Sequence, residues 1–165
     1  MNYRYHINAV EFLHLSEEVI SIFQAHKQTG RRKEAGGILL GTVYPEQRVL
    51  IKDATVPGYL DKAGRYFFDR SRRRAQRIVN KHWKKSSGDS IYLGEWHTHP
   101  EPSPSPSCRD RQMIRNMFNQ TWMEIEFLFL IIVGTDSLWV AIENGRELRL
   151  LDPIAGDDDK DTTIY

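Results

Sequence analysis

The residues best suited to chemistry lie in one short segment that begins at His97 and ends at Asp110. His97 and His99 are two residues apart in a predicted strand, and side chains in a strand alternate between its two faces. Both imidazoles therefore point the same way. Histidine nitrogen is a common zinc ligand, so this pair supplies half of a zinc site. The remaining ligands must come from other parts of the chain.

Asp110 is the third candidate ligand, because it continues the apolar face of a predicted helix. Met113, Ile114 and Met117 form that face, and Asp110 lies three, four and seven residues before them. An ionised carboxylate on a buried face needs a cation or hydrogen-bond donors. Two histidines and one aspartate leave a fourth position for water, which is typical of a catalytic zinc. We therefore expect one Zn²⁺ per chain.

Other interpretations of these residues remain open at this level. Ser107 and Asp110 also have the spacing of a helix capping box, and Ser107 can cap the helix while its hydroxyl points at the site. Glu95 shares a strand face with the two histidines, as in a two-histidine, one-carboxylate iron site. Three ligands along one strand, however, spread too far to converge easily on one ion. A hydrolase triad of Ser107, His97 and Asp110 would lack a nucleophile elbow.

Composition limits the class of protein. The 165 residues suit one domain, and a net charge of +1 favours no particular partner. The single cysteine, Cys108, excludes an intramolecular disulfide and a four-cysteine zinc site. No secretory signal is visible, and the longest apolar run, at residues 127–133, is far shorter than the ~20 residues of a membrane span. We expect a cytoplasmic protein that does not contact membranes.

The elements that position these residues follow from periodicity, caps and turns. The sequence predicts three helices, at residues 16–29, 69–85 and 107–119. It predicts strands at residues 35–43, 48–56, 90–99, 126–133, 138–143 and 147–151. This order favours an α/β fold with a single mixed β-sheet flanked by helices. We expect one domain at residues 1–155, followed by an acidic C-terminal tail at residues 156–165.

The spacing of the candidate ligands resembles that of a known family. His97-x-His99-Pro100, then six residues, then Ser107-x-x-Asp110 is similar to the full JAMM signature of the MPN-plus zinc metallopeptidases, including their prokaryotic JAB-type members. The resemblance extends from about residue 8 to residue 151. It implies the JAMM/MPN fold, which is cytidine-deaminase-like, and a zinc-dependent peptidase.

The same resemblance implies a role for each residue. The family carries a catalytic glutamate just before a glycine-containing apolar strand, and Glu34 stands at that place. Glu34 is then the general base, His97, His99 and Asp110 hold zinc, and the Ser107 hydroxyl stabilises the oxyanion. Without the resemblance, Glu34 would be interpreted as a solvated carboxylate in a basic loop.

The sequence around residues 94–101 and the compact size resemble the bacterial members, above all the deconjugating peptidases of cyclic-nucleotide antiphage (CBASS) operons. This implies an isopeptidase that hydrolyses the amide bond between a target and the C-terminus of a conjugated protein, thereby regulating antiphage defence. The expected partner is a protein with an extended C-terminal tail, either a nucleotidyltransferase or a ubiquitin-like protein. A processing peptidase for a sulfur-carrier or ubiquitin-like precursor, and a non-catalytic MPN scaffold, are the alternatives.

The remaining features have ordinary interpretations. Residues 70–85 are strongly basic, which is typical of the solvated face of an amphipathic helix, although such a face can also dock an acidic partner. No nucleic-acid motif accompanies the charge, so nucleic acid is not an expected partner. Trp122 and Trp139 are predicted to lie in the core.

Overall fold

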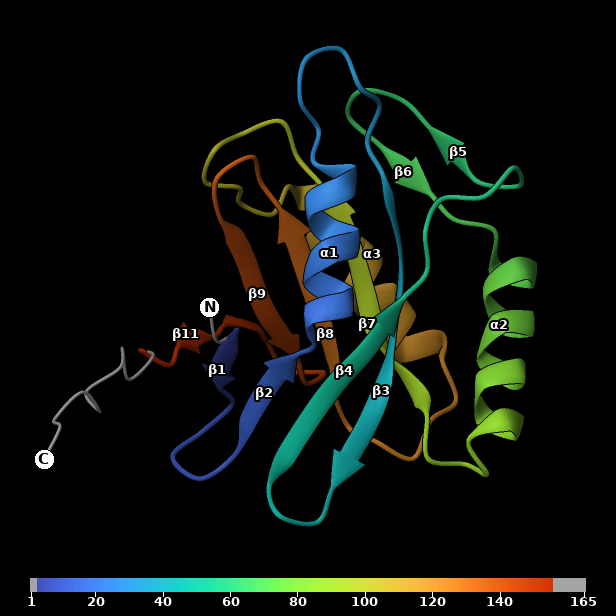
Figure 1. Cartoon of the computed structure of the whole chain (residues 1–165), viewed down its shortest axis with the longest axis vertical. Helices are drawn as coiled ribbons and strands as arrows, with labels where there is room; N and C mark the ends of the chain where they lie inside the picture. The colour runs from blue at the N-terminus through green and yellow to red at the C-terminus, as the bar shows by residue number, and fades with distance from the viewer. Residues whose placement is uncertain (1–2, 156–165) are drawn as a thin grey trace, which may run out of the picture.

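The computed structural model describes residues 3–155, so the predicted acidic tail at residues 156–165 lies outside the described residues (Figure 1). Three helices form: α1 Glu17–His26, α2 Arg72–Lys85 and α3 Cys108–Gln120. The strands are β1 Arg4–His6, β2 Phe12–Leu15, β3 Gly36–Tyr44, β4 Arg48–Ala54, β5 Lys62–Ala63, β6 Phe68–Asp69, β7 Ile91–Thr98, β8 Leu128–Val133, β9 Leu138–Glu143, β10 Leu148–Leu150 and β11 Asp152–Pro153.

One mixed sheet organises the molecule. Its strand order is β10-β9-β8-β7-β3-β4-β2-β1-β11, and β5 pairs with β6 in a separate small hairpin. The β7–β8 and β2–β4 pairs are parallel, and the other pairs are antiparallel. Strand β7, which carries His97, therefore lies inside the sheet between β8 and β3. The prediction of an α/β fold with a mixed sheet is confirmed.

The helices cover both faces of this sheet. Figure 1 shows α1 in front of the sheet and α3 behind it, with α2 along one side. The largest core cluster packs beneath α1 and includes Phe23, Leu39 and Trp96. On the other face, Ile114 of α3 packs on strand β8, and Ala75 of α2 packs on strand β3. Neighbouring residues of a strand thus point into different cores.

A bulge in β7 decides which of its residues point to which face. Leu93 and Trp96 both belong to the core under α1, although they are three residues apart. The register between β3 and β7 shifts at Leu39/Leu40, opposite Gly94, whose φ is 147°. A β-bulge reverses the alternation in this way. As a result Glu95 and His97 lie on the face of the sheet that α3 covers.

The predicted elements occur, with shifted ends. Ser16, Ser71 and Ser107 each cap a helix by accepting a hydrogen bond from a backbone N–H three residues later. Helix α1 ends at His26, earlier than the predicted residue 29, because the ψ of Lys27 is 134° and is no longer helical. None of the helices formed by residues 3–155 has both the length and the apolar character needed to cross a membrane.

The structure differs from the prediction at Trp122 and in several short strands. Trp122 is 94 % exposed, so its prediction as a core residue is wrong, whereas Trp139 packs against the cluster beneath α3. Trp122 lies in the irregular connection after α3, and within the described part of the chain no strand or helix covers it. The short strands β1, β2, β5, β6 and β11 were not predicted, because two to four residues are too few to show a period.

Candidate metal centre

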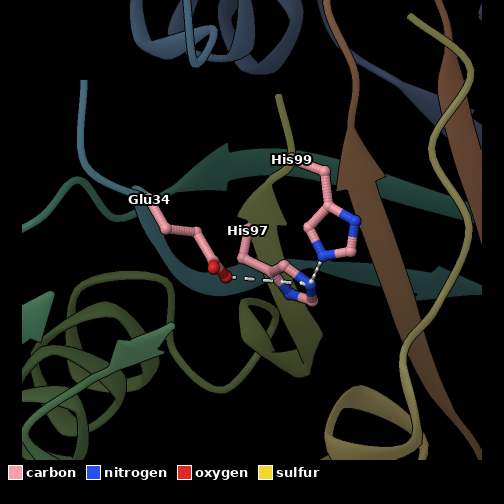
Figure 2. Close-up of side chains that lie close together, drawn as sticks. All are labelled: Glu34, His97 and His99. Atoms are coloured by element: carbon pink, nitrogen blue, oxygen red, sulfur yellow. Dashed lines mark hydrogen bonds and ion pairs between the residues drawn. The ribbon is translucent and has the colours of Figure 1, made fainter. Parts of the chain in front are cut away.

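The carboxyl end of β7 brings the two histidines together. The side chain of His97 is almost completely buried and that of His99 is mostly buried, and their Nε2 atoms are 3.2 Å apart. The backbone N–H of His99 donates to the Val133 carbonyl, which holds the residue against β8 just beyond the end of β7. The prediction that both imidazoles point the same way is confirmed (Figure 2).

Asp110 reaches the histidines from the first turn of α3. Its Oδ1 lies 3.1 Å from His97 Nε2, and its Oδ2 lies 3.3 Å from His99 Nε2. Metal–ligand bonds of about 2.0–2.2 Å in a tetrahedral site place neighbouring ligand atoms roughly 3.3 Å apart. The separation between the two Nε2 atoms, and that from each Nε2 to its nearer Asp110 oxygen, are all close to this value, with Oδ1 near His97 and Oδ2 near His99. Two imidazoles and one carboxylate are therefore close enough to share a metal ion.

Glu34 approaches the same histidines from the start of β3. Its carboxylate Oε1 is 4.0 Å from His97 Nε2, and its side chain is almost completely buried (Figure 2). Together with His97 and His99 it forms a group whose ligand atoms lie within 4.8 Å of one another. The interpretation of Glu34 as a solvated loop residue is therefore wrong, since the chain folds over it.

The two carboxylates differ in their electrostatics. Burial raises the pKa of Glu34 to about 7, although the nearby histidines oppose this shift. Burial also disfavours the ionised form of Asp110, but hydrogen bonds with His97 and His99 outweigh it and hold the pKa of Asp110 well below its ordinary value. The lowered pKa of Asp110 favours its ionised form at neutral pH, which suits a metal ligand, and Glu34 can gain and lose a proton near neutral pH.

Ser107 is the N-cap of α3 and contacts Asp110 directly. Its Oγ donates to Asp110 Oδ2 at 2.7 Å and accepts from the Asp110 backbone N–H at 3.1 Å, while its own N–H donates to Oδ2 at 2.7 Å. Both halves of the predicted capping box are present. This serine lies at the exposed rim of the site. Because its hydroxyl bonds to Asp110, the structure lends no support to a hydrolase triad.

Glu95 has other partners, so the alternative iron site is wrong. Its carboxylate accepts two hydrogen bonds from Arg70 Nε, at 2.8 and 3.0 Å, and one from Arg70 Nη2 at 2.6 Å. The Tyr92 hydroxyl donates to it at 2.6 Å. Arg70 follows β6, so this buried ion pair ties the β5–β6 hairpin to the central strand instead of binding a metal.

Sequence reasoning missed Glu101, which contacts the outer nitrogen of a site histidine. Its Oε2 lies 3.1 Å from His99 Nδ1. A carboxylate there fixes the tautomer that presents Nε2 to a metal. The signal was available, because Glu101 follows His99 by two residues and stands just after Pro100.

The site combines two imidazoles with one ionised carboxylate and one carboxylate that can exchange a proton near neutral pH. This combination is typical of metal-dependent hydrolases. The chain belongs to the family described as prokaryotic homologs of the JAB domain, whose model matches residues 16–150. This match confirms the family that the sequence motifs resemble, and it indicates a peptidase.

Relatives agree with this placement. The chain is 37 % identical over 134 residues to a "CD-NTase/cGAS isopeptidase" of Pseudomonas aeruginosa, covering 81 % of this chain and 84 % of that protein. A Vibrio cholerae protein of the same name is 35 % identical over 135 residues, covering 82 % and 81 %. The solution structure of protein DSY2949 from Desulfitobacterium hafniense has the same fold, with a TM-score of 0.61, 18 % identity and coverage of 90 % and 95 %.

Proposed function

We propose that this chain is a zinc-dependent isopeptidase that releases a conjugated protein from its target by hydrolysing the amide bond at the C-terminus of that protein. The observation that carries the proposal is the set of short separations among His97 Nε2, His99 Nε2 and the Asp110 carboxylate, with Glu34 beside them. The names of the relatives support the deconjugating activity.

His97, His99 and Asp110 would hold one zinc ion. Nitrogen and carboxylate donors suit Zn²⁺, and the three ligands leave an open position. A bound zinc would supply a Lewis acid that polarises the scissile carbonyl and acidifies water. Glu101 would orient His99 through its Nδ1, and Ser107 would orient the Asp110 carboxylate.

Glu34 would act as the general base and then the general acid. Its pKa of about 7 lets it take a proton from the attacking water and return it to the leaving amine. Its side chain is almost completely buried, which would limit exchange of this proton with bulk water. The Ser107 hydroxyl, at the rim, would donate to the developing oxyanion once substrate draws it from Asp110.

The substrate would be a protein with an extended C-terminal tail, either a conjugated nucleotidyltransferase or a ubiquitin-like protein, and the reaction would take place in the cytoplasm. The β5–β6 hairpin lies beside the site, because the Glu34 N–H donates to the Gly64 carbonyl at 2.8 Å. An extended tail can add to such a short strand pair through main-chain hydrogen bonds. Antiphage regulation would follow if the released protein were the operon's nucleotidyltransferase.

The test combines metal content with cleavage. The substrate would be a fusion of a target to the C-terminus of a neighbouring conjugated protein, and the proteins would be wild type, Glu34→Gln and Asp110→Asn. We expect one zinc in wild type and in Glu34→Gln, with cleavage lost in Glu34→Gln. Asp110→Asn should lose zinc and activity together.

The exposed residue Glu124 provides the control, because Glu124→Gln removes a carboxylate away from the site and should leave both readouts unchanged. Wild type without bound metal would favour the non-catalytic scaffold instead. Bound zinc with cleavage of only an unconjugated precursor would favour the processing peptidase.

A further inference from the structure

A chain of buried hydrogen bonds runs beneath the site, on the face of β7 opposite to the histidines. It contains Gln28, just after α1, and Thr98, which stands between the two histidines in the sequence. Gln28 is 1 % exposed and Thr98 is 0 % exposed. Burying a polar side chain is costly unless its donors and acceptors are paired. What these two residues bind therefore indicates what they stabilise.

Thr98 joins the histidine strand to the segment that carries Glu34. Its backbone N–H donates to the Ala35 carbonyl at 2.8 Å, and its Oγ1 accepts from the Ala35 N–H at 2.9 Å. A regular antiparallel ladder would supply a backbone carbonyl for that N–H. Here a side-chain hydroxyl takes its place, so the last bond before Glu34 depends on the type of residue at position 98.

Gln28 joins the same segment to the β5–β6 hairpin. Its Nε2 donates to the Arg65 carbonyl in the hairpin at 2.7 Å and to the Arg32 carbonyl at 3.2 Å. Its Oε1 accepts from Thr98 Oγ1 at 3.4 Å. One amide thus bonds to the loop before Glu34, to the hairpin beside it and to the strand of the metal-site histidines.

Glu34 is consequently held from two sides. Its own N–H donates to Gly64 of the hairpin, and the next residue, Ala35, is fixed to Thr98. The 4.0 Å separation between Glu34 Oε1 and His97 Nε2 depends on where this backbone lies. A displacement of about 1 Å at a reacting group can reduce a rate about a hundredfold.

We propose that Gln28 and Thr98 are positioning residues for Glu34: they fix its backbone between the histidine strand and the β5–β6 hairpin, so that the base faces the metal centre. The proposal rests on the proposed function for its kinetic readout.

Two nearly isosteric variants test the proposal with the fusion substrate. Thr98→Val removes the hydroxyl, and Gln28→Met removes the amide, while each keeps the approximate shape. We expect kcat to fall about tenfold to hundredfold, with a smaller change in KM and with one zinc still bound. Thr98→Ser restores a hydroxyl and should recover most of the wild-type kcat.

Thr42→Val is the matched control. Thr42 is a buried threonine of β3, 3 % exposed, whose hydroxyl donates to Asp89 instead of to the site. Its substitution should lower stability without lowering kcat. If Thr42→Val lowered kcat as much as Thr98→Val, or if Thr98→Val had the wild-type kcat, the positioning role would be wrong.

Amide hydrogen exchange gives a readout that does not depend on turnover. In Thr98→Val and Gln28→Met, residues 28–36 and 62–69 should exchange faster than in wild type, and in Thr42→Val they should not. Unchanged exchange in these two segments would overturn the proposal even if activity fell. If wild type failed to cleave the fusion, the proposed function would be wrong, while the exchange result would still decide whether these residues hold the Glu34 segment.

Discussion

Glu34 and Asp110 carry the same functional group and face the same two histidines, yet their surroundings give them opposite properties. Burial is the main influence on Glu34 and raises its pKa to about 7. Asp110 is also buried, but hydrogen bonds with both histidines and with Ser107 hold its pKa low and keep it ionised. When two carboxyl groups have such different pKa values, they suit different roles. Glu34 suits proton transfer, and Asp110 suits binding of a cation.

The affinity for metal should fall as the pH is lowered. Burial opposes a charge on His99, but hydrogen bonding and the negative charges of Asp110, Glu34 and Glu101 raise its pKa overall. A raised pKa means that the metal-free protein keeps this proton to a higher pH than an ordinary histidine does. Zinc must displace the proton, so its affinity should fall up to about tenfold per pH unit for each proton released.

Competition with a chromophoric chelator between about pH 8 and about pH 6 measures this slope. His14→Ala serves as the control, because His14 lies on β2 away from the site and should leave the slope unchanged. An affinity that stays constant over this range would contradict the prediction.

Ser107 combines a structural role, as the cap of α3, with the roles proposed for it at the site, and substitutions can separate them. Ser107→Ala removes the N-cap of α3, at a cost of about 1 kcal/mol of stability, and also the proposed oxyanion donor, at a cost of about 10²–10³ in kcat. Ser107→Thr keeps a capping oxygen and a hydroxyl, so it should preserve most of both. Thermal unfolding and turnover of wild type and the two variants distinguish the roles. If Ser107→Ala kept the wild-type kcat, the oxyanion role would be wrong and Ser107 would serve only as the helix cap.

At the scale of elements, the bulge at Gly94 decides the face on which the site is built. A Cβ at this position would lie 2.0 Å from the Phe129 carbonyl oxygen, and its φ of 147° is one that L-residues rarely adopt. Because the bulge reverses the alternation of β7, His97 points toward α3 and Asp110 while Leu93 points toward α1. A single glycine thus aligns the histidines with the helix that completes their site.

Gly94→Ala should therefore be strongly destabilising, by more than about 2 kcal/mol, because steric overlap adds to backbone strain. Gly30 offers a matched comparison, since its φ of 60° is also positive, but a Cβ there would meet no atom of residues 3–155 within 4 Å. Gly30→Ala should cost only about 1 kcal/mol. Urea denaturation of both variants checks the ranking, and equal losses would show that the contact with Phe129 is relieved at little cost.

The sequence predicted those elements that carry their own signals. Apolar periods located all three helices, with serine caps predicted only at Ser16 and Ser107, and the spacing of His97, His99 and Asp110 was enough to suggest a shared site. The role of Glu34 came only through resemblance, because its burial depends on a distant hairpin, contacted through Gly64. When a residue is buried by a segment distant in the sequence, the residues next to it in the chain show no pattern that predicts the burial.

At the scale of the whole molecule, the last strands connect the two ends of the sheet. Strand β10 pairs with β9 at one end of the strand order, and β11 pairs with β1 at the other. Only Leu151 separates β10 from β11, so the sheet must curve until its ends approach each other. The family match covers residues 16–150, so the β1–β11 pair that completes this connection lies outside the matched residues.

Leu151 should be a major determinant of stability, because it belongs to the largest core cluster at the point where the two ends of the sheet approach. It is 2 % exposed, and its N–H donates to the Val140 carbonyl at 2.9 Å, whereas its neighbour Leu150 is 52 % exposed. Leu151→Ala should lower the free energy of unfolding by about 2–5 kcal/mol. Leu150→Ala should change it by no more than about 0.5 kcal/mol. Chemical denaturation of the two variants measures the difference. Similar small losses for both would mean that the ends of the sheet are held by the β1–β11 pairing alone, and that the core continues to pack without a side chain at residue 151.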